Sequence, residues 1–354
     1  MIQQDKALVE ASCPLPPLDG IRGMAAGFVV LCHSKYAGFG GGPAGMGTFG
    51  VMLFFCLSGF LMVHRNLPRR STITDWVAFE IQRFIRVYPP FFLATFSVLM
   101  LSAAELEGSP FTTDWHDLIP IWMLREPGGI FWTISVELKF YLVYPLIALI
   151  LAGRSSTSIA LVFFGWVASV LAVGHAWMFA FFSFFVSGNL AAVVLQKTPP
   201  LWCRFSPKAR EIVGWVSLLL VIVAATTGGY NDLADPNLWE TMWRKSWLLG
   251  PVCAFFIANL ALAKGTLRWL FANPLARAFG RISYSLYLTH WFVLQAMRTR
   301  LNHNLLGSLI TFVAMLIFAV LFYAVAEYPF SRLGARLRRR LAARTKLHSA
   351  EESS

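Results

Sequence analysis

About ten long apolar stretches, separated by shorter polar segments, run through this chain. A helix that spans a bilayer needs about 20 mostly apolar residues, so each stretch has roughly the length of one span. The chain has 57% hydrophobic and only 14% charged residues, whereas a soluble domain has about 25% charged residues. We therefore predict an all-α membrane protein with about ten transmembrane helices, near residues 18–35, 47–64, 88–104, 130–152, 159–174, 176–195, 211–227, 247–263, 282–297 and 307–328.

Basic residues are distributed unequally among the segments between these stretches. Lys and Arg accumulate in the cytoplasmic loops of membrane proteins. With both termini in the cytoplasm, 22 of the 30 Lys and Arg residues lie in inner segments and six in outer segments, and Arg22 and Lys139 lie within spans. The sequence therefore predicts cytoplasmic termini and an outer loop near residues 105–129.

Three regions follow from this topology: a cytoplasmic leader (1–17), a transmembrane domain (18–330) and a basic cytoplasmic tail (331–354). The net charge of +12 and the pI near 9.8 would indicate nucleic-acid binding in a soluble protein. Here the positive-inside bias and contacts with anionic lipid headgroups explain the charge. We expect membrane lipids as partners and no nucleic acid. The tail is either a headgroup-binding anchor or a solvated basic segment.

The cysteines do not indicate a metal or redox site. No CxxC pair and no metal-ligand spacing occurs among them, so we predict no metal and treat the cysteines within spans as small apolar residues. They are Cys13, Cys32, Cys56, Cys203 and Cys253.

Ionisable residues within predicted spans indicate function, because each is energetically costly there. Arg22 and His33 share one face of the first span, separated by about 16 Å along the helix axis. Glu137 enters the fourth span from the outer side, by about two turns, and reaches a depth similar to that of His33. The two side chains are suited to be a general base and its orienting carboxylate. A structural pair that holds two helices together is the alternative.

Six short motifs in order make the chain resemble the bacterial acyltransferase-3 family of multispan membrane O-acyltransferases. The family elements that they resemble are LDGLRG with a following His, FFxLSGF, RxxRxYP, WSLSVEEQFY, GxxSYxxYLxH and ExP. Two residues depart from the fourth element, since Leu138 and Lys139 replace its second acid and its Gln. The matching segments are Leu18–Gly23 with His33, Gly50–Phe60, Arg83–Pro89, Trp132–Tyr141, Gly280–His290 and Glu327–Pro329.

The resemblance implies an enzyme that transfers an acyl group, most often acetyl, from cytoplasmic acyl-CoA to a hydroxyl of an extracytoplasmic or lipid-linked glycan. It implies a bacterial inner (plasma) membrane protein in the single-domain form, without a C-terminal esterase-like domain. Acyl-CoA is then a co-substrate, and no bound cofactor is expected. Within this scheme His33 and Glu137 are the catalytic candidates.

Arginine side chains at the predicted inner mouth suit the phosphates of acyl-CoA, because the guanidinium is a planar fork of donors. Arg22, Arg83 and Arg86 are therefore the donor-binding candidates, and ordinary positive-inside charge is the alternative. The motifs supply further site candidates, of which Ser58 with Gly59 also suits close helix packing and His290 also suits a helix–helix hydrogen bond. These further candidates are Asp19, Ser58, Ser135, Tyr141, Tyr287 and His290.

A proton-coupled multispan transporter is the main alternative, because intramembrane His, Glu and Arg also occur in carriers. The chain lacks the paired repeat halves that many transporters have, and its polar residues concentrate in the first, second and fourth spans. The sequence decides neither the glycan acceptor, nor the length of the acyl group, nor the choice between direct transfer and an acyl-histidine intermediate, nor the oligomeric state.

Overall fold

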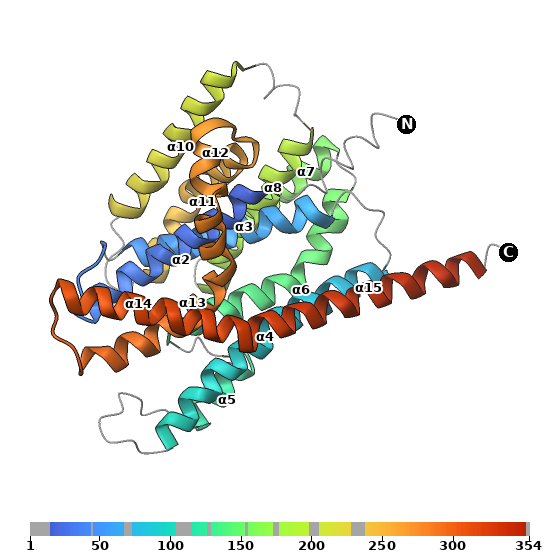
Figure 1. Cartoon of the computed structure of the whole chain (residues 1–354). Coiled ribbons are helices and arrows are strands. Elements are labelled where there is room, and N and C mark those ends of the chain that lie inside the picture. Colours follow the sequence, from blue (N-terminus) through green and yellow to red (C-terminus); the bar gives the residue numbers. More distant parts are fainter. Residues whose placement is uncertain are drawn as a thin grey trace. The chain divides into compact units, whose positions relative to one another are not determined.

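A computed structural model describes residues 15–43, 45–66, 73–103, 115–125, 129–152, 155–172, 177–197, 205–227 and 238–351 of the chain. Within these ranges the regular structure is helical and no β-strand occurs, which confirms the all-α class. The elements (Figure 1) are α2 (Pro16–Tyr36), α3 (Gly45–Asn66), α4 (Ile73–Ala103), α5 (Trp115–Trp122), η1 (Gly129–Phe131), α6 (Trp132–Ala152), α7 (Ser156–Ala172), α8 (Trp177–Lys197), α10 (Pro207–Thr227), α11 (Leu238–Leu262), α12 (Gly265–Ala272), α13 (Pro274–Arg298), α14 (Leu305–Phe322), η2 (Tyr323–Glu327) and α15 (Tyr328–Glu351).

Each predicted apolar stretch coincides with a helix of the structure. By length and hydropathy, five helical stretches of the described residues are able to cross a membrane: they lie in α3, α4, α6, α10 and the continuous helix that joins α14, η2 and α15. A sixth candidate is the pair of α11 and α12, whose axes bend by 99°. The count of ten spans and the orientation of the termini stay predictions.

The helices form two compact units. One unit contains α2, α3, α7, α8, α10, α11 and α12, together with the last part of α6 and the first part of α13. The other unit contains α4, α5, η1, α14, η2 and α15, together with the rest of α6 and α13. The division falls after Pro145 in α6 and after Ser283 in α13.

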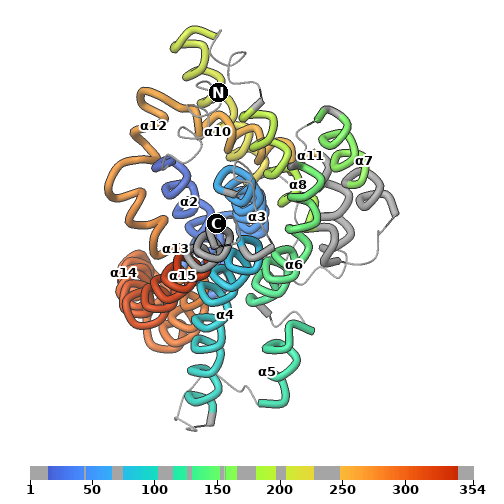
Figure 2. The backbone as a smooth tube through the Cα atoms, turned by 90° about the vertical axis from the view of Figure 1, so that its right-hand side faces the viewer, coloured from blue at the N-terminus to red at the C-terminus, as the bar shows by residue number. Residues whose placement is uncertain are grey.

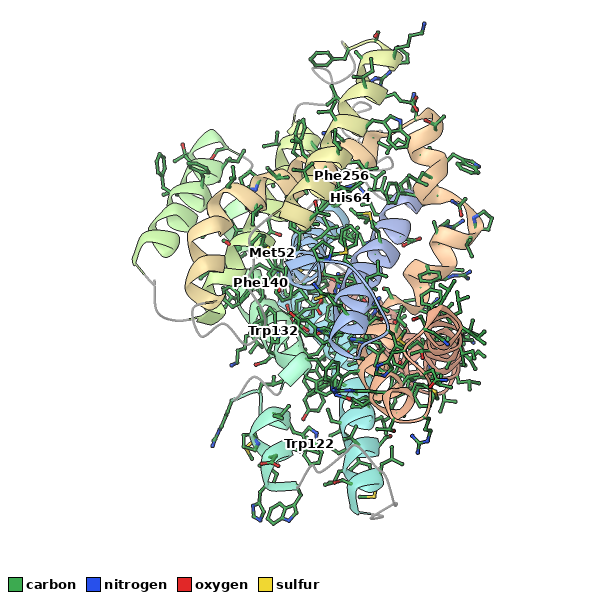
Figure 3. The ribbon with its side chains drawn as sticks, turned by 90° about the vertical axis from the view of Figure 1, so that its left-hand side faces the viewer. Met52, His64, Trp122, Trp132, Phe140 and Phe256 are labelled. Carbon is green, nitrogen blue, oxygen red and sulfur yellow. The ribbon has the colours of Figure 1, made fainter. Side chains whose placement is uncertain are left out.

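In the unit that contains α2, helices α3, α8 and α11 make the most extensive contacts. Figure 3 shows Met52 and His64 along α3 and Phe256 on α11, and all three side chains are buried. Gly59 and Gly188 bring α3 and α8 together, because a Cβ on Gly59 would overlap the backbone of Phe185 and one on Gly188 would overlap that of Cys56. Small residues allow this approach between spans, which is the packing role that the sequence suggested as one alternative for the Ser58–Gly59 pair; the close approach is seen at Gly59.

In the unit that contains α4, helices α4 and α15 lie side by side (Figures 1 and 2). Arg338 of α15 donates to the side-chain oxygen of Gln82 at 2.9 Å, and the Arg338 guanidinium lies 5.8 Å from the centre of the Phe79 ring. The predicted basic tail from residue 331 therefore continues a helix and packs, at least through Arg338, against the N-terminal half of α4.

Candidate functional site

The carboxylate of Glu137 lies in the second turn of α6, and its hydrogen-bond donor is the hydroxyl of Tyr141, one turn later. Positions i and i+4 share a helix face, so the spacing in the sequence brings the two side chains together. Glu137 is half-buried, and only 2% of the Tyr141 surface is exposed. A buried phenol thus fixes one orientation of this carboxylate.

Arg83, on α4, also contacts Tyr141 and so adds a third polar side chain to the pair of Glu137 and Tyr141. Its Nη1 donates to the Tyr141 hydroxyl oxygen at 3.5 Å. Its guanidinium carbon lies 5.4 Å from the centre of the Tyr141 ring and 5.3 Å from that of Phe79, within the range of about 6 Å at which cations attract aromatic faces. Arg83, Tyr141 and Glu137 form a continuous polar chain between α4 and α6, which we call the Arg83–Glu137 chain.

Arg86 follows Arg83 by one turn of α4 and is also half-buried. Because α4 is helical through both residues, their spacing of three positions places them on one face of the helix. Tyr284, on α13, donates to the carbonyl oxygen of Val87 at 2.7 Å and so joins α13 to this level of α4.

Ser135 and Tyr287 anchor the polypeptide around the start of α6. Ser135 donates to the Leu124 carbonyl oxygen at 3.1 Å, and Thr133 donates to the Tyr287 hydroxyl oxygen at 2.8 Å. The Tyr287 hydroxyl in turn donates to the carbonyl of Ile130. Both candidates are buried, and these bonds give them a role in positioning the segment that leads to Glu137.

His290 and Glu327 are both buried among the helices of the same unit. The Nδ1–H of His290 donates to the carbonyl oxygens of Leu286 at 3.1 Å and Tyr287 at 2.8 Å, within its own helix. Glu327, in the π-helical turn η2, accepts from the backbone N–H and the hydroxyl of Ser285 at 3.2 and 2.7 Å. Glu327 thereby ties η2 to α13.

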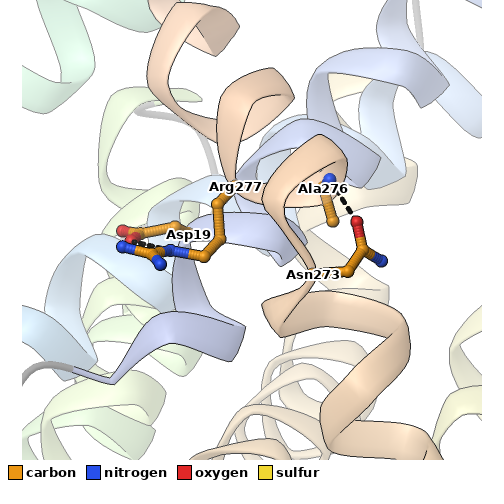
Figure 4. Close-up of polar contacts among 4 residues, drawn as sticks. All are labelled: Asp19, Asn273, Ala276 and Arg277. Atoms are coloured by element: carbon orange, nitrogen blue, oxygen red, sulfur yellow. Dashed lines mark hydrogen bonds and ion pairs between the residues drawn. The ribbon is translucent and has the colours of Figure 1, made fainter.

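The other unit contains the candidates from the first predicted span. Helix α2 is continuous through Arg22 and His33, which supports their predicted common face. Arg22 is half-buried and His33 is 6% exposed. Asp19 pairs with Arg277 of α13 at 3.9 Å (Figure 4), with side chains 40% and 50% exposed. Such exposed pairs contribute only about 0–1 kcal/mol, so we assign Asp19 a minor role in joining α2 to α13.

The glycines that surround Arg22 serve close packing. A Cβ on Gly20 would overlap the backbone of Phe271, and one on Gly23 would lie 2.9 Å from the Phe279 Cβ. An apolar groove of about 500 Å³ lies along the same helices, lined by residues that include Gly20, Gly23, Leu218 and Ile222. In the sequence these two glycines were part of the first family motif, but their role in helix packing was not predicted.

Comparison with known proteins identifies the family. The family model described as an acyltransferase domain matches residues 16–324. The chain belongs to the acyltransferase-3 family. Together with its long apolar helices, this membership makes the chain an integral membrane protein.

Three curated relatives of this acyltransferase-3 chain illustrate the range of similarity. A Staphylococcus aureus (strain COL) protein named "Putative O-acetyltransferase" is 23% identical over 91% of this chain and 58% of its own length. "Acyltransferase MdmB" of Streptomyces mycarofaciens is 32% identical over 37% of this chain and 38% of its own length. "Nodulation protein 10" of Rhizobium leguminosarum bv. viciae is 27% identical over 28% of this chain and 32% of its own length.

The chain spans about 58% of the length of the staphylococcal relative, which is less than two thirds. No solved structure matches this chain.

The two units divide the candidate residues of this acyltransferase-3 chain. Asp19, Arg22, His33 and Ser58 belong to one unit. The Arg83–Glu137 chain belongs to the other unit, together with Arg86, Ser135, Tyr287 and His290. The structure thus brings Arg83, Tyr141 and Glu137 together, although the sequence analysis placed Arg83 at the inner mouth and Glu137 about two turns from the outer side. The pairing of His33 with Glu137 stays a prediction. In the described part of the chain, no three His, Cys, Asp or Glu side chains converge as metal ligands.

Sequence reasoning missed Trp76, Glu80 and Tyr144 in the unit that contains Glu137. Each has a buried polar atom that finds no hydrogen-bond partner in the described part of the chain, namely the indole Nε1, a carboxylate oxygen and the phenol oxygen. An unsatisfied buried polar group costs about 1–3 kcal/mol. The one signal available in the sequence was the position of Glu80, an acidic residue three positions before Arg83 at the start of an apolar helix.

Proposed function

We propose that this chain transfers an acyl group, acetyl in the simplest case, from cytoplasmic acyl-CoA to a hydroxyl of an extracytoplasmic or lipid-linked glycan. The observation that carries the proposal is the family match across residues 16–324. The name of the staphylococcal relative, which is similar over most of this chain, supports the transfer of acetyl to oxygen.

Arg22, Arg83 and Arg86 are the proposed ligands of the donor phosphates. Hydrogen bonds between guanidinium and phosphate are charge-assisted and stronger than neutral ones. Arg83 supports this role because its guanidinium is held between two aromatic rings and is therefore pre-oriented. Its partner in the structure is a phenol, so the hydrogen bond at 3.5 Å leaves most of its five N–H donors for a phosphate.

His33 is the proposed general base, because the ordinary pKa of an imidazole, about 6.5, suits proton transfer near neutral pH. The acceptor hydroxyl gives its proton to His33 while its oxygen attacks the thioester carbonyl carbon. The carbon–sulfur bond then breaks, and the sulfur leaves with the bonding electrons and takes up the proton as the CoA thiol. An acyl-histidine intermediate is the alternative if donor and acceptor bind at different depths.

Glu137 is the proposed partner of the second imidazole nitrogen, where it fixes the tautomer and stabilises the imidazolium. A carboxylate has about four lone-pair sites, so the bond from Tyr141 is compatible with this second one. In this scheme Tyr141 is a positioning residue that links the carboxylate to the phosphate-binding Arg83.

The decisive experiment compares the surface glycans of a deletion strain and its complemented partner by mass spectrometry. We expect an ester-linked acyl group on the glycans of the complemented strain and its loss in the deletion strain. Purified full-length protein in lipid nanodiscs then receives isotopically labelled acetyl-CoA and the glycan so identified. Identical glycans in the two strains, with no acyl transfer in nanodiscs, would refute the proposal.

A further inference from the structure

Three polar groups that lack partners gather between α4 and α6. Within the described residues, Trp76 Nε1, Glu80 Oε1 and the Tyr144 hydroxyl oxygen are buried and have no hydrogen-bond partner. Trp76 and Glu80 lie one turn apart on α4, and the Trp76 ring meets the Tyr144 ring edge to face, with centroids 5.8 Å apart. More than nine in ten buried polar groups in proteins have a hydrogen-bond partner, so three adjacent exceptions indicate a missing ligand.

These groups continue the Arg83–Glu137 chain. Phe79 packs against Tyr144 with ring centroids 5.7 Å apart and also lies under the Arg83 guanidinium at 5.3 Å. The contacts pair Trp76 with Tyr144 and Arg83 with Tyr141, so α4 and α6 are antiparallel here. The polar groups therefore follow a fixed order along the two helices: Trp76, Glu80 and Tyr144 first, then Arg83 with Tyr141, and then Glu137.

The chemistry of the three groups defines what they can bind. An indole N–H only donates, an ionised carboxylate only accepts, and a phenol does both. The edge of an adenine base offers the complement: an exocyclic amino group for Glu80 and ring nitrogens that accept from Trp76 and Tyr144. The aromatic rings of Trp76, Phe79 and Tyr144 pack around these groups and give the neighbourhood the apolar character that suits a flat purine.

We propose that Trp76, Glu80 and Tyr144 form the subsite for the adenine base of the acyl-CoA donor. This inference rests on the proposed function. The order along the helices matches the order within the donor, in which phosphates separate the adenosine from the chain that carries the thioester. Trp76 and Arg83 are seven residues apart, which is about 10 Å along a helix. One nucleotide can therefore place its base at Trp76 and its phosphates at Arg83.

The test uses full-length protein in nanodiscs and substitutions that remove the polar atom and keep the approximate size of each side chain: Trp76→Phe, Glu80→Met and Tyr144→Phe. We expect each to raise the Kd of adenosine 3′,5′-bisphosphate about tenfold, the effect of one lost hydrogen bond. The Kd of a pantetheine thioester, which has no adenine, should stay unchanged. Trp269→Phe and Tyr328→Phe are matched controls, because these side chains are 70% and 44% exposed on α12 and α15.

A second arm leaves the protein unchanged and alters the base. In 1,N6-etheno-CoA the amino group and one ring nitrogen of adenine are blocked, so the wild-type protein should bind it about tenfold more weakly than CoA. Equal binding of the two, or an unchanged Kd of adenosine 3′,5′-bisphosphate in all three variants, overturns the subsite and leaves the proposed function intact. Absence of any CoA binding to the wild-type protein removes the proposed function and this subsite together.

Discussion

The Tyr141 hydroxyl contacts two charged groups, since it accepts from Arg83 and donates to Glu137. Tyr141→Phe removes these bonds and keeps the ring beside the guanidinium. A hydrogen bond to a charged group contributes about 1.5–3 kcal/mol, so we expect acyl transfer to slow by about 10- to 100-fold, with a larger effect on kcat than on KM. Steady-state assays in nanodiscs measure this, with Tyr328→Phe as control; unchanged kcat would show that the hydroxyl does not orient Glu137.

His33 and Glu137 are expected to act as one catalytic unit. Loss of a general base slows a reaction by about 10²–10⁴-fold, so His33→Ala and Glu137→Gln should each reduce acyl transfer by that order while donor binding stays near normal. Residues that act together have non-additive effects, and the double variant should be little slower than either single variant. Substantial turnover by His33→Ala would exclude the general-base mechanism and leave the family assignment standing.

The arginine candidates are expected to act on donor affinity. Arg22→Ala, and Arg83→Ala combined with Arg86→Ala, remove charge-assisted bonds to phosphate that contribute about 1.5–3 kcal/mol each. We expect the Kd of acetyl-CoA to rise by at least about tenfold per lost bond, as measured by titration of protein in nanodiscs. Arg300→Ala, an exposed arginine after α13, is the control. An unchanged Kd in these variants would remove the proposed phosphate site.

The sequence predicted single site residues better than their partners. Glu137 and Tyr141 were both candidates, and their i, i+4 spacing makes their contact a local property that sequence contains. The contacts of Arg83 with Tyr141 and of Trp76 with Tyr144 join residues far apart in the chain, and no local pattern specifies them. For the same reason Trp76, Glu80 and Tyr144 escaped notice: a polar atom without a partner becomes visible only once its neighbours are known.

At the scale of elements, the contact between α3 and α8 depends on two glycines that face the opposite backbone. Gly59→Ala and Gly188→Ala each force the helices apart, and overpacking of this kind typically costs about 1–3 kcal/mol. We therefore expect a lower melting temperature for both variants in thermal unfolding of detergent-solubilised protein. Gly27→Ala in α2 is the matched control, because a Cβ there meets no atom within 4 Å and alanine favours a helix. Equal melting temperatures for all three would contradict the close approach.

Hydropathy predicted correctly where the apolar helices lie, but it did not predict where each helix begins and ends. Helix α4 begins at Ile73 and runs through Pro89 and Pro90, although the predicted span began only at residue 88. The earlier part is less apolar and is held by α15, a tertiary contact that hydropathy does not detect. The short helices α5 and α12 lie in segments that were predicted as loops, because eight residues are too few to produce a spanning signal.

At the scale of the whole molecule, the helix from Leu305 to Leu341 exceeds the thickness of a membrane. Its 37 residues measure roughly 55 Å, against about 30 Å for the hydrocarbon core. We infer that the apolar α14 is the spanning part and that the basic α15 extends beyond it. Because α15 contacts Gln82 next to Arg83, the same inference places this basic end and the N-terminal half of α4 on one side of the membrane.

The predicted orientation places that side in the cytoplasm, and cysteine labelling tests it. Asn302, in the turn after α13, is predicted to be outside, and Lys264, between α11 and α12, inside; both are exposed in the structure. The described native cysteines Cys32, Cys56 and Cys253 are buried and should react slowly. In intact spheroplasts, a membrane-impermeant maleimide should label Asn302→Cys and not Lys264→Cys, which should react only after permeabilisation. The wild-type protein gives the background for both. The reverse pattern would invert the topology, contradict the 22-to-six distribution of basic residues, and place Arg83 and Arg86 on the side away from cytoplasmic acyl-CoA.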